Sequence, residues 1–160
     1  MDYRGKTPTK TDEGIFLVTA KNVKDGYIDY EASKEYISED DYEEVMHRGK
    51  PQIGDVLFTT EAPCGNVAQV NREDIALAQR IIKYRGHYQV VDNTYLKHYL
   101  LSPEFQGVLS AKSTGGTVQG IKGSVLHQQI ISFPKFEEQE RIGAFLERID
   151  NLITLQQCKS

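Results

Sequence analysis

The chain has 160 residues and a formal net charge of −4, because 19 lysines and arginines are outnumbered by 23 aspartates and glutamates. This length suits one domain, and the absence of any run of about 18 apolar residues excludes a membrane-spanning helix. The first ten residues contain no apolar signal core, and two widely spaced cysteines fit a reduced cytoplasmic compartment. The negative balance argues against nucleic-acid binding, since such proteins usually present a basic surface.

The negative charge is concentrated in one segment. Residues 25–46 hold nine acidic side chains and one basic side chain, Lys34, which gives a charge of −8. The rest of the chain therefore carries +4, and a folded surface can present a positive face beside a negative one. The average charge alone does not exclude a DNA-binding face.

The first predicted elements are a strand and a helix. Residues 15–20 (IFLVTA) form a short apolar run rich in β-forming residues, which predicts a buried strand. An Asp-Gly turn follows at residues 25–26. Ser38 is expected to begin a helix, because a capping-box pattern follows it and acidic residues suit the positive end of the helix dipole. That helix is expected to stop at Gly49.

Four further strands are predicted from short apolar runs. Two predicted helices lie between the third and the fourth of these strands. The helices begin at Asn93, where the apolar period becomes helical, and at Ser102, an N-cap that precedes a proline. Strands and helices mix without a regular βαβ alternation, so we predict an α+β fold, a single mixed α/β domain with a twisted β-rich core. The predicted strands cover residues 56–58, 66–70, 78–84 and 129–133.

A different kind of helix is predicted from Phe136 onward. Its apolar residues recur at spacings of 4, 3 and 4, which is the seam of a coiled coil. About two heptads are too few to decide between a helix packed on its own domain and an arm that pairs with an outside helix. We expect a domain over residues 1–135 and the start of a coiled-coil helix over residues 136–160. The seam residues are Ile142, Leu146, Ile149 and Ile153.

No catalytic or metal-binding motif can be recognised. The histidines at positions 47, 87, 98 and 127 form no pair with ligand spacing, and neither a phosphate-binding glycine loop nor a nucleophile elbow is present. Asp55 and Glu61 flank a predicted strand, and a nuclease could use two such carboxylates with Mg²⁺. The lysine that usually completes such a site, one or two positions after the second carboxylate, is missing after Glu61. Cys64 could be a nucleophile, but no histidine or aspartate partner for it can be assigned from the sequence. A non-catalytic binding protein is therefore preferred, and a small metal nuclease stays an alternative.

Short polar motifs recur at the predicted strand ends and in a glycine-rich loop. Hydroxyl, amide and guanidinium groups on a rigid frame are the groups that read base edges and phosphates. Ordinary turns use the same residue types, so the pattern alone leaves both interpretations open. The motifs lie at residues 19–22, 59–63, 79–80 and 113–122.

Sequence blocks spread over nearly the whole chain carry a family resemblance. They include the runs at residues 3–8 (YRGKTP), 15–23 (IFLVTAKNV), 54–67 (GDVLFTTEAPCGNV), 113–121 (STGGTVQGI) and 137–142 (EEQERI). Through these blocks the chain resembles the target recognition domain of the specificity subunit of type I restriction-modification systems.

The resemblance implies a non-enzymatic protein that reads double-stranded DNA. Specificity subunits of the family carry two such domains, each of which reads one half of a split target, and their spacer helices dock the methyltransferase (M) subunits. S-adenosylmethionine, ATP and Mg²⁺ are expected only in partner subunits, the restriction (R) subunit among them, and this chain is expected to bind no cofactor or metal. Complete specificity then needs a second copy or a second recognition domain, joined through the C-terminal helix.

Roles are assigned to residues by the chemistry of their side chains. Asn and Gln can pair bidentately with adenine, Arg and Lys with guanine, and Glu can accept from cytosine, whereas Lys and Arg dominate phosphate contacts. A protein-interaction module without DNA affinity of its own is the rival interpretation. Base readout is expected from Lys21, Asn22, Thr60, Glu61, Gln79, Arg80, Thr117 and Gln119. Phosphate contacts are expected from Arg4, Lys6, Lys10, Lys50 and Lys122. The seam residues are expected to pair with a second helix and to contribute to the methyltransferase interface.

Overall fold

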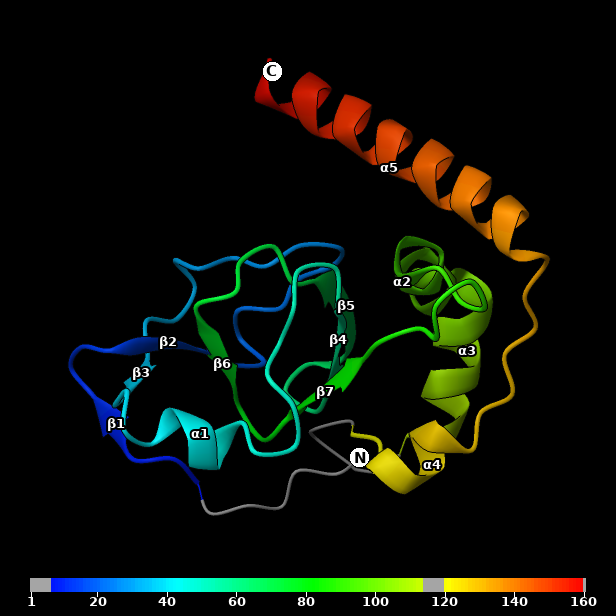
Figure 1. Ribbon diagram of the computed structural model, residues 1–160. Helices are drawn as coiled ribbons and strands as arrows, with labels where there is room; N and C mark the ends of the chain where they lie inside the picture. The colour runs from blue at the N-terminus through cyan, green and yellow to red at the C-terminus, as the bar shows by residue number, and fades with distance from the viewer. Residues whose placement is uncertain (1–6, 114–119, 160) are drawn as a thin grey trace.

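The computed structural model describes residues 7–113 and 120–159, and in these ranges the chain forms two β-sheets, four short helices and one long C-terminal helix (Figure 1). This architecture agrees with the predicted α+β class. The strands are β1 (Lys10–Thr11), β2 (Ile15–Val18), β3 (Tyr36–Ile37), β4 (Val56–Thr60), β5 (Cys64–Gln69), β6 (Ile75–Leu77) and β7 (Ile81–Tyr84). The helices are α1 (Tyr42–Val45), α2 (Asn93–Leu101), α3 (Pro103–Lys112), α4 (Gly123–His127) and α5 (Phe136–Cys158).

The first sheet joins distant parts of the chain in the order β1-β3-β2-β6. Strands β2 and β6 are parallel, with Val18 opposite Leu77, and the N–H of Ala78 continues the pairing by donating to the carbonyl of Val18 at 2.9 Å. The other pairs in this sheet are antiparallel. Because parallel strands run in the same direction, the turns that follow β2 and β6 lie side by side, at the edge of the sheet where the C-terminal ends of these two strands meet.

The second sheet has the order β5-β4-β7, and both of its pairs are antiparallel. Thr59 lies opposite Ile81, so the end of β4 meets the start of β7. The turn after β6 leads directly into β7. The ends of β2, β4 and β6 are therefore gathered around one short stretch of chain, residues 78–80.

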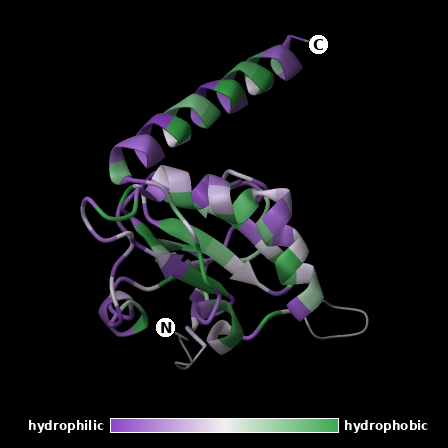
Figure 2. Ribbon diagram, turned by 90° about the vertical axis from the view of Figure 1, so that its right-hand side faces the viewer, coloured by the Kyte–Doolittle hydropathy of each residue, from purple (hydrophilic) through white to green (hydrophobic). Residues whose placement is uncertain are grey.

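Two apolar clusters hold the sheets and helices together. One surrounds the first sheet and includes Val45 of α1; the other lies between the second sheet and α2, α3 and α4. The strands form the hydrophobic interior in Figure 2. Leu17, Ile37 and Phe58 are among the largest fully buried side chains, and each contributes roughly 1.5–3 kcal/mol of transfer free energy.

The starts of α2, α3 and α5 confirm the sequence predictions. The Asp92 carboxylate accepts from the N–H of Tyr95 at 2.8 Å, and the Ser102 hydroxyl accepts from the N–H of Phe105 at 3.3 Å. Helix α5 begins at Phe136, the predicted boundary. Within the described ranges, no helix combines the length and the hydropathy that a bilayer crossing requires.

Three element predictions are wrong. Residues 129–133 form no strand, and Ile130 is 92% exposed, because the five-residue helix α4 precedes them and no neighbouring strand pairs with them. The strand predicted over 78–84 exists only from Ile81 onward, as β7, because residues 78–80 form the turn that follows β6, a strand that was not predicted. The helix expected from Ser38 starts only at Tyr42, since the Ser38 hydroxyl accepts from the N–H of Asp41 in a turn instead of capping a helix.

Candidate nucleic-acid interface

Thr60, Glu61 and Arg80 meet where β4 ends and β7 begins. The N–H and the hydroxyl of Thr60 both donate to the carbonyl of Arg80, at 3.0 and 3.2 Å. Nε of Arg80 lies 2.8 Å from Oε1 of Glu61, and the two side chains are 58% and 45% exposed. Three of the predicted readout residues thus form one accessible cluster on a backbone that hydrogen bonds hold in place.

The segment after residue 119 joins this cluster. The N–H of Ile121 donates to the carbonyl of Thr60 at 2.9 Å, and Glu61 and Gly120 form an antiparallel bridge. Lys122 follows with an exposed side chain and immediately precedes α4. The remaining predicted residues of this loop and of the N-terminus lie outside the described residues: Thr117, Gln119, Arg4 and Lys6.

Lys21 and Gln79 lie on the turns that follow the parallel strands β2 and β6, and so share a sheet edge with Arg80. Lys21 is exposed, and Nε2 of Gln79 donates to the hydroxyl of Thr7 at 3.3 Å. In Figure 1 the turn between β6 and β7 and helix α4 lie in the lower part of the molecule, whereas α5 runs along the top. We define the readout edge as Lys21, Thr60, Glu61, Gln79, Arg80 and Lys122.

Asn22 does not belong to the readout edge, and its assignment to base readout is corrected. Its side chain is fully buried, and Oδ1 accepts from both the N–H and the hydroxyl of Thr19 at 2.9 Å. Its amide donates to the carbonyls of Asp29 and Ser33 at 2.9 and 2.8 Å. Because a buried polar group must be hydrogen-bonded, Asn22 orders the loop between β2 and β3 and has no group left for a base.

Two of the predicted phosphate ligands are paired elsewhere on the surface. Lys10 lies on β1, the outer strand of the first sheet on the side away from β6. Its Nζ is 2.8 Å from Oε2 of Glu35. Lys50 contacts Glu43, which raises the pKa of Lys50, and its backbone carbonyl accepts from Lys83 on β7. Exposed ion pairs are weak, so either lysine can still exchange its carboxylate partner for a phosphate. Neither lies on the readout edge.

Asp55 is a structural carboxylate. It is 1% exposed, and it accepts from Nε and Nη2 of Arg85 at 2.6 and 2.7 Å and from the N–H of Gln52 at 2.8 Å. Burial opposes the charged form, but the bonds from Arg85 and Gln52 outweigh it and lower the pKa of Asp55. Asp55 precedes β4 and Glu61 follows it, roughly 17 Å along an extended strand. The two carboxylates therefore cannot share a metal ion, which removes the geometry of a metal nuclease.

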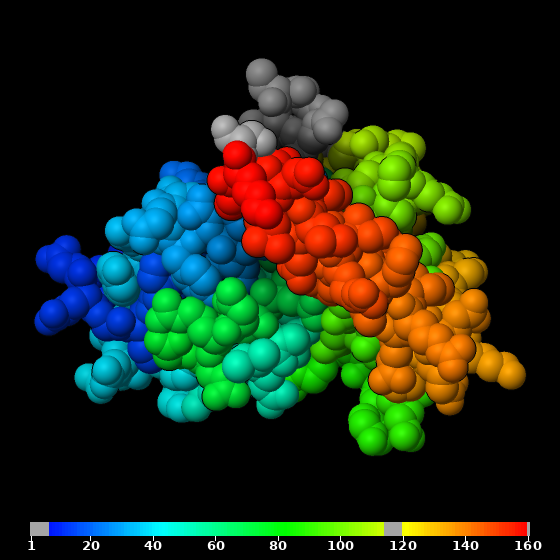
Figure 3. Space-filling view, turned by 90° about the horizontal axis from the view of Figure 1, so that it is seen from above, coloured from blue at the N-terminus to red at the C-terminus, as the bar shows by residue number. Residues whose placement is uncertain are grey.

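Helix α5 is anchored to α2 at its N-terminal end. Gln139 is fully buried: Oε1 accepts from the N–H of Asp92 at 2.9 Å, and Nε2 donates to the carbonyls of Val90 and Pro134 at 3.0 and 2.9 Å. Gly143, one turn later, is also buried against α2. Seen from above, α5 forms a continuous ridge across the molecule (Figure 3).

The predicted seam of α5 is only partly covered. Ile142, Leu146 and Ile149 are half-buried, whereas Ile153 is 51% exposed. Its neighbours Leu152 and Leu155 are 64% and 58% exposed. The helix thus packs on its own domain at one end, as one interpretation of the sequence expects, and presents an exposed apolar face at the other. Coiled-coil pairing stays a prediction.

A polar cluster that the sequence did not reveal also links α2 to α5. Lys97 is 4% exposed and contacts Glu147, and Nε2 of His98 lies 3.1 Å from Oε1 of the same carboxylate. Burial and the nearby Lys97 lower the pKa of His98. His98, Glu147 and Asp150 place one potential metal-ligand atom each within 4.8 Å of one another. The Lys97 ammonium already supplies the positive charge there, so we interpret the cluster as an interhelical contact.

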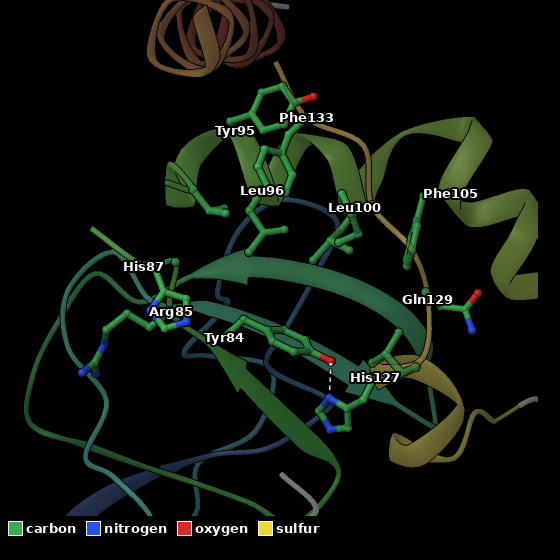
Figure 4. A pocket seen from close by; sticks show the side chains of 14 residues that line it. Tyr84, Arg85, His87, Tyr95, Leu96, Leu100, Phe105, His127, Gln129 and Phe133 are labelled. Atoms are coloured by element: carbon green, nitrogen blue, oxygen red, sulfur yellow. Dashed lines mark hydrogen bonds between the residues drawn. The ribbon is translucent and has the colours of Figure 1, made fainter. Parts of the chain in front are cut away.

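A cavity of about 240 Å³ lies beside β7, α2 and the segment that follows α4 (Figure 4). Tyr84 and His127 point toward each other in it, with the hydroxyl 3.4 Å from Nδ1, and burial raises the pKa of Tyr84 to about 12. Tyr84 ends β7, whereas Arg80 precedes its first residue. The cavity is therefore no part of the readout edge.

Comparison with known families decides what kind of domain carries this edge. The family described as type I restriction modification DNA specificity domain matches residues 6–160. The chain belongs to this family. A comparison with curated proteins found no match.

Solved structures resemble this specificity domain in fold. A chain from work on complex assembly and conformational transition of the type I R-M system is 22% identical, with a TM-score of 0.66 over 97% of the specificity domain and 37% of that chain. The type I S subunit from M. genitalium is 18% identical, with a TM-score of 0.58 and coverage of 96% and 39%. The HsdS subunit from Thermoanaerobacter tengcongensis is 22% identical, with a TM-score of 0.60 and coverage of 94% and 34%. The specificity domain thus spans less than two-fifths of the length of each.

Proposed function

We propose that this chain is the DNA-reading domain of a type I restriction-modification specificity subunit and recognises a short sequence in double-stranded DNA. The observation that carries the proposal is the readout edge, where three turns and the segment at 120–122 meet on one side of the fold. Its hydroxyl, amide and guanidinium groups are those that bind base edges in the major groove. The family to which the chain belongs supports the same role.

Lys122, predicted as a phosphate ligand, supplies charge for the DNA backbone, and Lys21, predicted for base readout, adds a second positive charge on the readout edge. Both are exposed, and neither ammonium forms an ion pair with any residue the structure describes. The acidic helix α1 is close by, since Met46 at its end lines a shallow pocket with Ala78 and Ile81. The acidic side chains of α1 then oppose the attraction between these lysines and DNA, and we expect weak binding by the isolated chain and specific binding in a complex.

The partners in this proposal are double-stranded DNA, methyltransferase subunits and a restriction subunit. The exposed apolar end of α5 is the surface that we assign to helix pairing, with a second copy or a second recognition domain, and to methyltransferase docking. This part of α5 runs away from the readout edge (Figure 1), so that DNA and protein partners bind at separate places. In the proposal the chain is non-catalytic, and cofactors belong to the partner subunits.

Sequence selection from random duplex DNA tests the proposal. The purified chain, with and without its methyltransferase partner, is used to capture duplexes, which are then sequenced. Enrichment of a short motif supports DNA reading. Recovery of no duplex in either arm contradicts it and favours the rival protein-interaction module, and Mg²⁺-dependent cut ends contradict the non-catalytic assignment.

A further inference from the structure

Within the described ranges, the ion pair between Glu61 and Arg80 engages Nε of the guanidinium and leaves the edge formed by its two terminal amino groups unoccupied. Nε of Arg80 is engaged by Oε1 of Glu61 at 2.8 Å. Among the residues that the structure describes, the two terminal amino groups of Arg80 have no hydrogen-bond partner. Guanidinium is planar and has five N–H donors, so the edge that remains presents two parallel donors.

The backbone around the pair is fixed. Thr60 bonds twice to the carbonyl of Arg80, and Glu61 bridges to Gly120. Both side chains therefore project from anchored positions, and the carboxylate restricts the rotation of the guanidinium. Holding a planar donor group in one orientation reduces the ordering cost of binding and makes its contacts more selective.

The charge of the pair separates base reading from phosphate contact. An unpaired arginine is drawn to phosphate oxygens. Arg80 with Glu61 beside it has no net charge, and a phosphate contact would bring the carboxylate close to a second anion. A base edge carries no net charge, so contact with a base avoids this repulsion.

Two parallel donors fit one base in particular. Guanine presents O6 and N7 as neighbouring acceptors in the major groove, whereas adenine presents an N6 amino donor beside N7. We propose that Glu61 and Arg80 form a guanine-reading unit, in which Arg80 contacts O6 and N7 and Glu61 is the positioning residue. This inference rests on the proposed function and adds the base class that this part of the edge selects.

The first test changes the DNA and leaves the protein intact. The motif selected by the chain with its methyltransferase partner is expected to contain a guanine that Arg80→Ala no longer selects, with the other positions kept. Replacing that guanine with 7-deazaguanine removes the N7 acceptor and is expected to weaken wild-type binding. The Arg80→Ala chain is expected to bind both duplexes equally, at roughly 10- to 100-fold lower affinity than wild type on the cognate site.

The second test isolates the role of Glu61. Glu61→Ala frees Arg80 and adds one net positive charge, so binding to random duplexes is expected to hold or increase while discrimination against adenine at that position falls. Glu61→Gln keeps an acceptor for Nε and is expected to restore part of the discrimination. A merely structural role for Glu61 predicts equal losses on cognate and random duplexes, which contradicts the proposal.

The possible failures can be told apart. A selected motif with no guanine, or one whose guanine Arg80→Ala still selects, overturns the guanine-reading unit and leaves DNA recognition standing. Absence of any duplex binding by the wild-type chain and its partner overturns both. Melting temperatures of the three variants are measured alongside, and because both side chains are about half exposed we expect little change.

Discussion

The backbone N–H of Asp92 donates a 2.9 Å hydrogen bond to Oε1 of Gln139 on α5. The carboxylate of the same Asp92 caps the N-terminus of α2, so one residue contacts both helices. The other end of the same Gln139 amide donates to two backbone carbonyls, Val90 before α2 and Pro134 before α5. One buried side chain thus connects the β7–α2 loop, the segment before α5 and α5 itself. The direction in which the long helix leaves the domain depends on this contact.

Gln139→Ala is expected to lower the free energy of unfolding by about 2–3 kcal/mol. The substitution leaves the N–H of Asp92 and two carbonyls without partners in a buried place, and one such group costs about 1–3 kcal/mol. Urea unfolding followed by circular dichroism measures the change. Gln157→Ala on the exposed end of the same helix is the matched control and should change stability by less than about 0.5 kcal/mol. Equal effects of the two substitutions would contradict the anchoring role.

Gly143→Ala tests how tightly α5 lies against α2. A Cβ at this position would stand 3.1 Å from the N of Tyr95 and 3.2 Å from Oδ1 of Asp92, and the backbone N cannot turn aside. Gly107→Ala in α3 is the control, because a Cβ there meets nothing within 4 Å. Helix propensity favours both alanines by roughly 1 kcal/mol, so Gly107→Ala is expected to stabilise by about that amount. The Gly143→Ala chain is expected to unfold at lower urea than the control, and equal stabilisation of both would mean that the helix contact is loose.

Docking of α5 is expected to weaken in mild acid. Burial and Lys97 lower the pKa of His98 below its ordinary value of 6.5, although Asp150 acts in the opposite direction. The unfolded chain therefore takes up a proton before the folded chain does, so stability is full above about pH 6.5 and falls as the pH drops below it. Hydrogen exchange of the α5 amides at pH 7.5 and 5.5 measures the effect. In His98→Gln the difference between the two pH values should shrink, and an unchanged difference assigns the pH dependence to another group.

The sequence predicts those parts of the fold whose signals are local. The N-cap of α3 and the starts of α2 and α5 were placed correctly because Ser102 and the 3-to-4 apolar spacing act within a few residues. The three-residue strand β6 has no such signal, since its partner β2 is about 60 residues away and parallel. Residues 129–133 read as a strand from their apolar side chains, but a strand needs a partner that no local pattern specifies.

The candidate site shows the same division. The polar turns were recognisable as turns, and the parallel pairing of β2 with β6 then brought Lys21, Gln79 and Arg80 to one edge. What the sequence does not encode locally is burial: Asn22 and Lys21 are neighbours in one motif, yet Asn22 is fully buried and Lys21 is exposed. Gln139 had a usable signal, because it lies on the apolar stripe of α5 three residues before Ile142.

Asp55→Asn is expected to destabilise the fold by about 2–4 kcal/mol, because it removes the charge that Arg85 and Lys83 face in a buried place. The control is Asp74→Asn, which removes the partner of Arg72 in an exposed pair and should cost less than about 1 kcal/mol. Because the pKa of Asp55 is lowered, its contribution is present above its ordinary value of 3.8 and is lost as the pH falls below it. Urea unfolding of both variants and of the wild type at pH 7 and pH 3 compares the two, and equal losses for the two variants at pH 7 would contradict a structural role for Asp55.

Lys122→Ala separates backbone contact from base reading at the readout edge. Lys122 is exposed beside the bridge between Glu61 and Gly120, and a lysine on a phosphate releases about one counterion when DNA binds. We therefore expect weaker binding to every duplex by a similar factor, with the slope of log affinity against log salt reduced by about one unit. Lys159→Ala, at the far end of α5, is the control and should leave the slope unchanged. A loss confined to one sequence would place Lys122 on a base edge instead, and an unchanged slope would remove it from the interface.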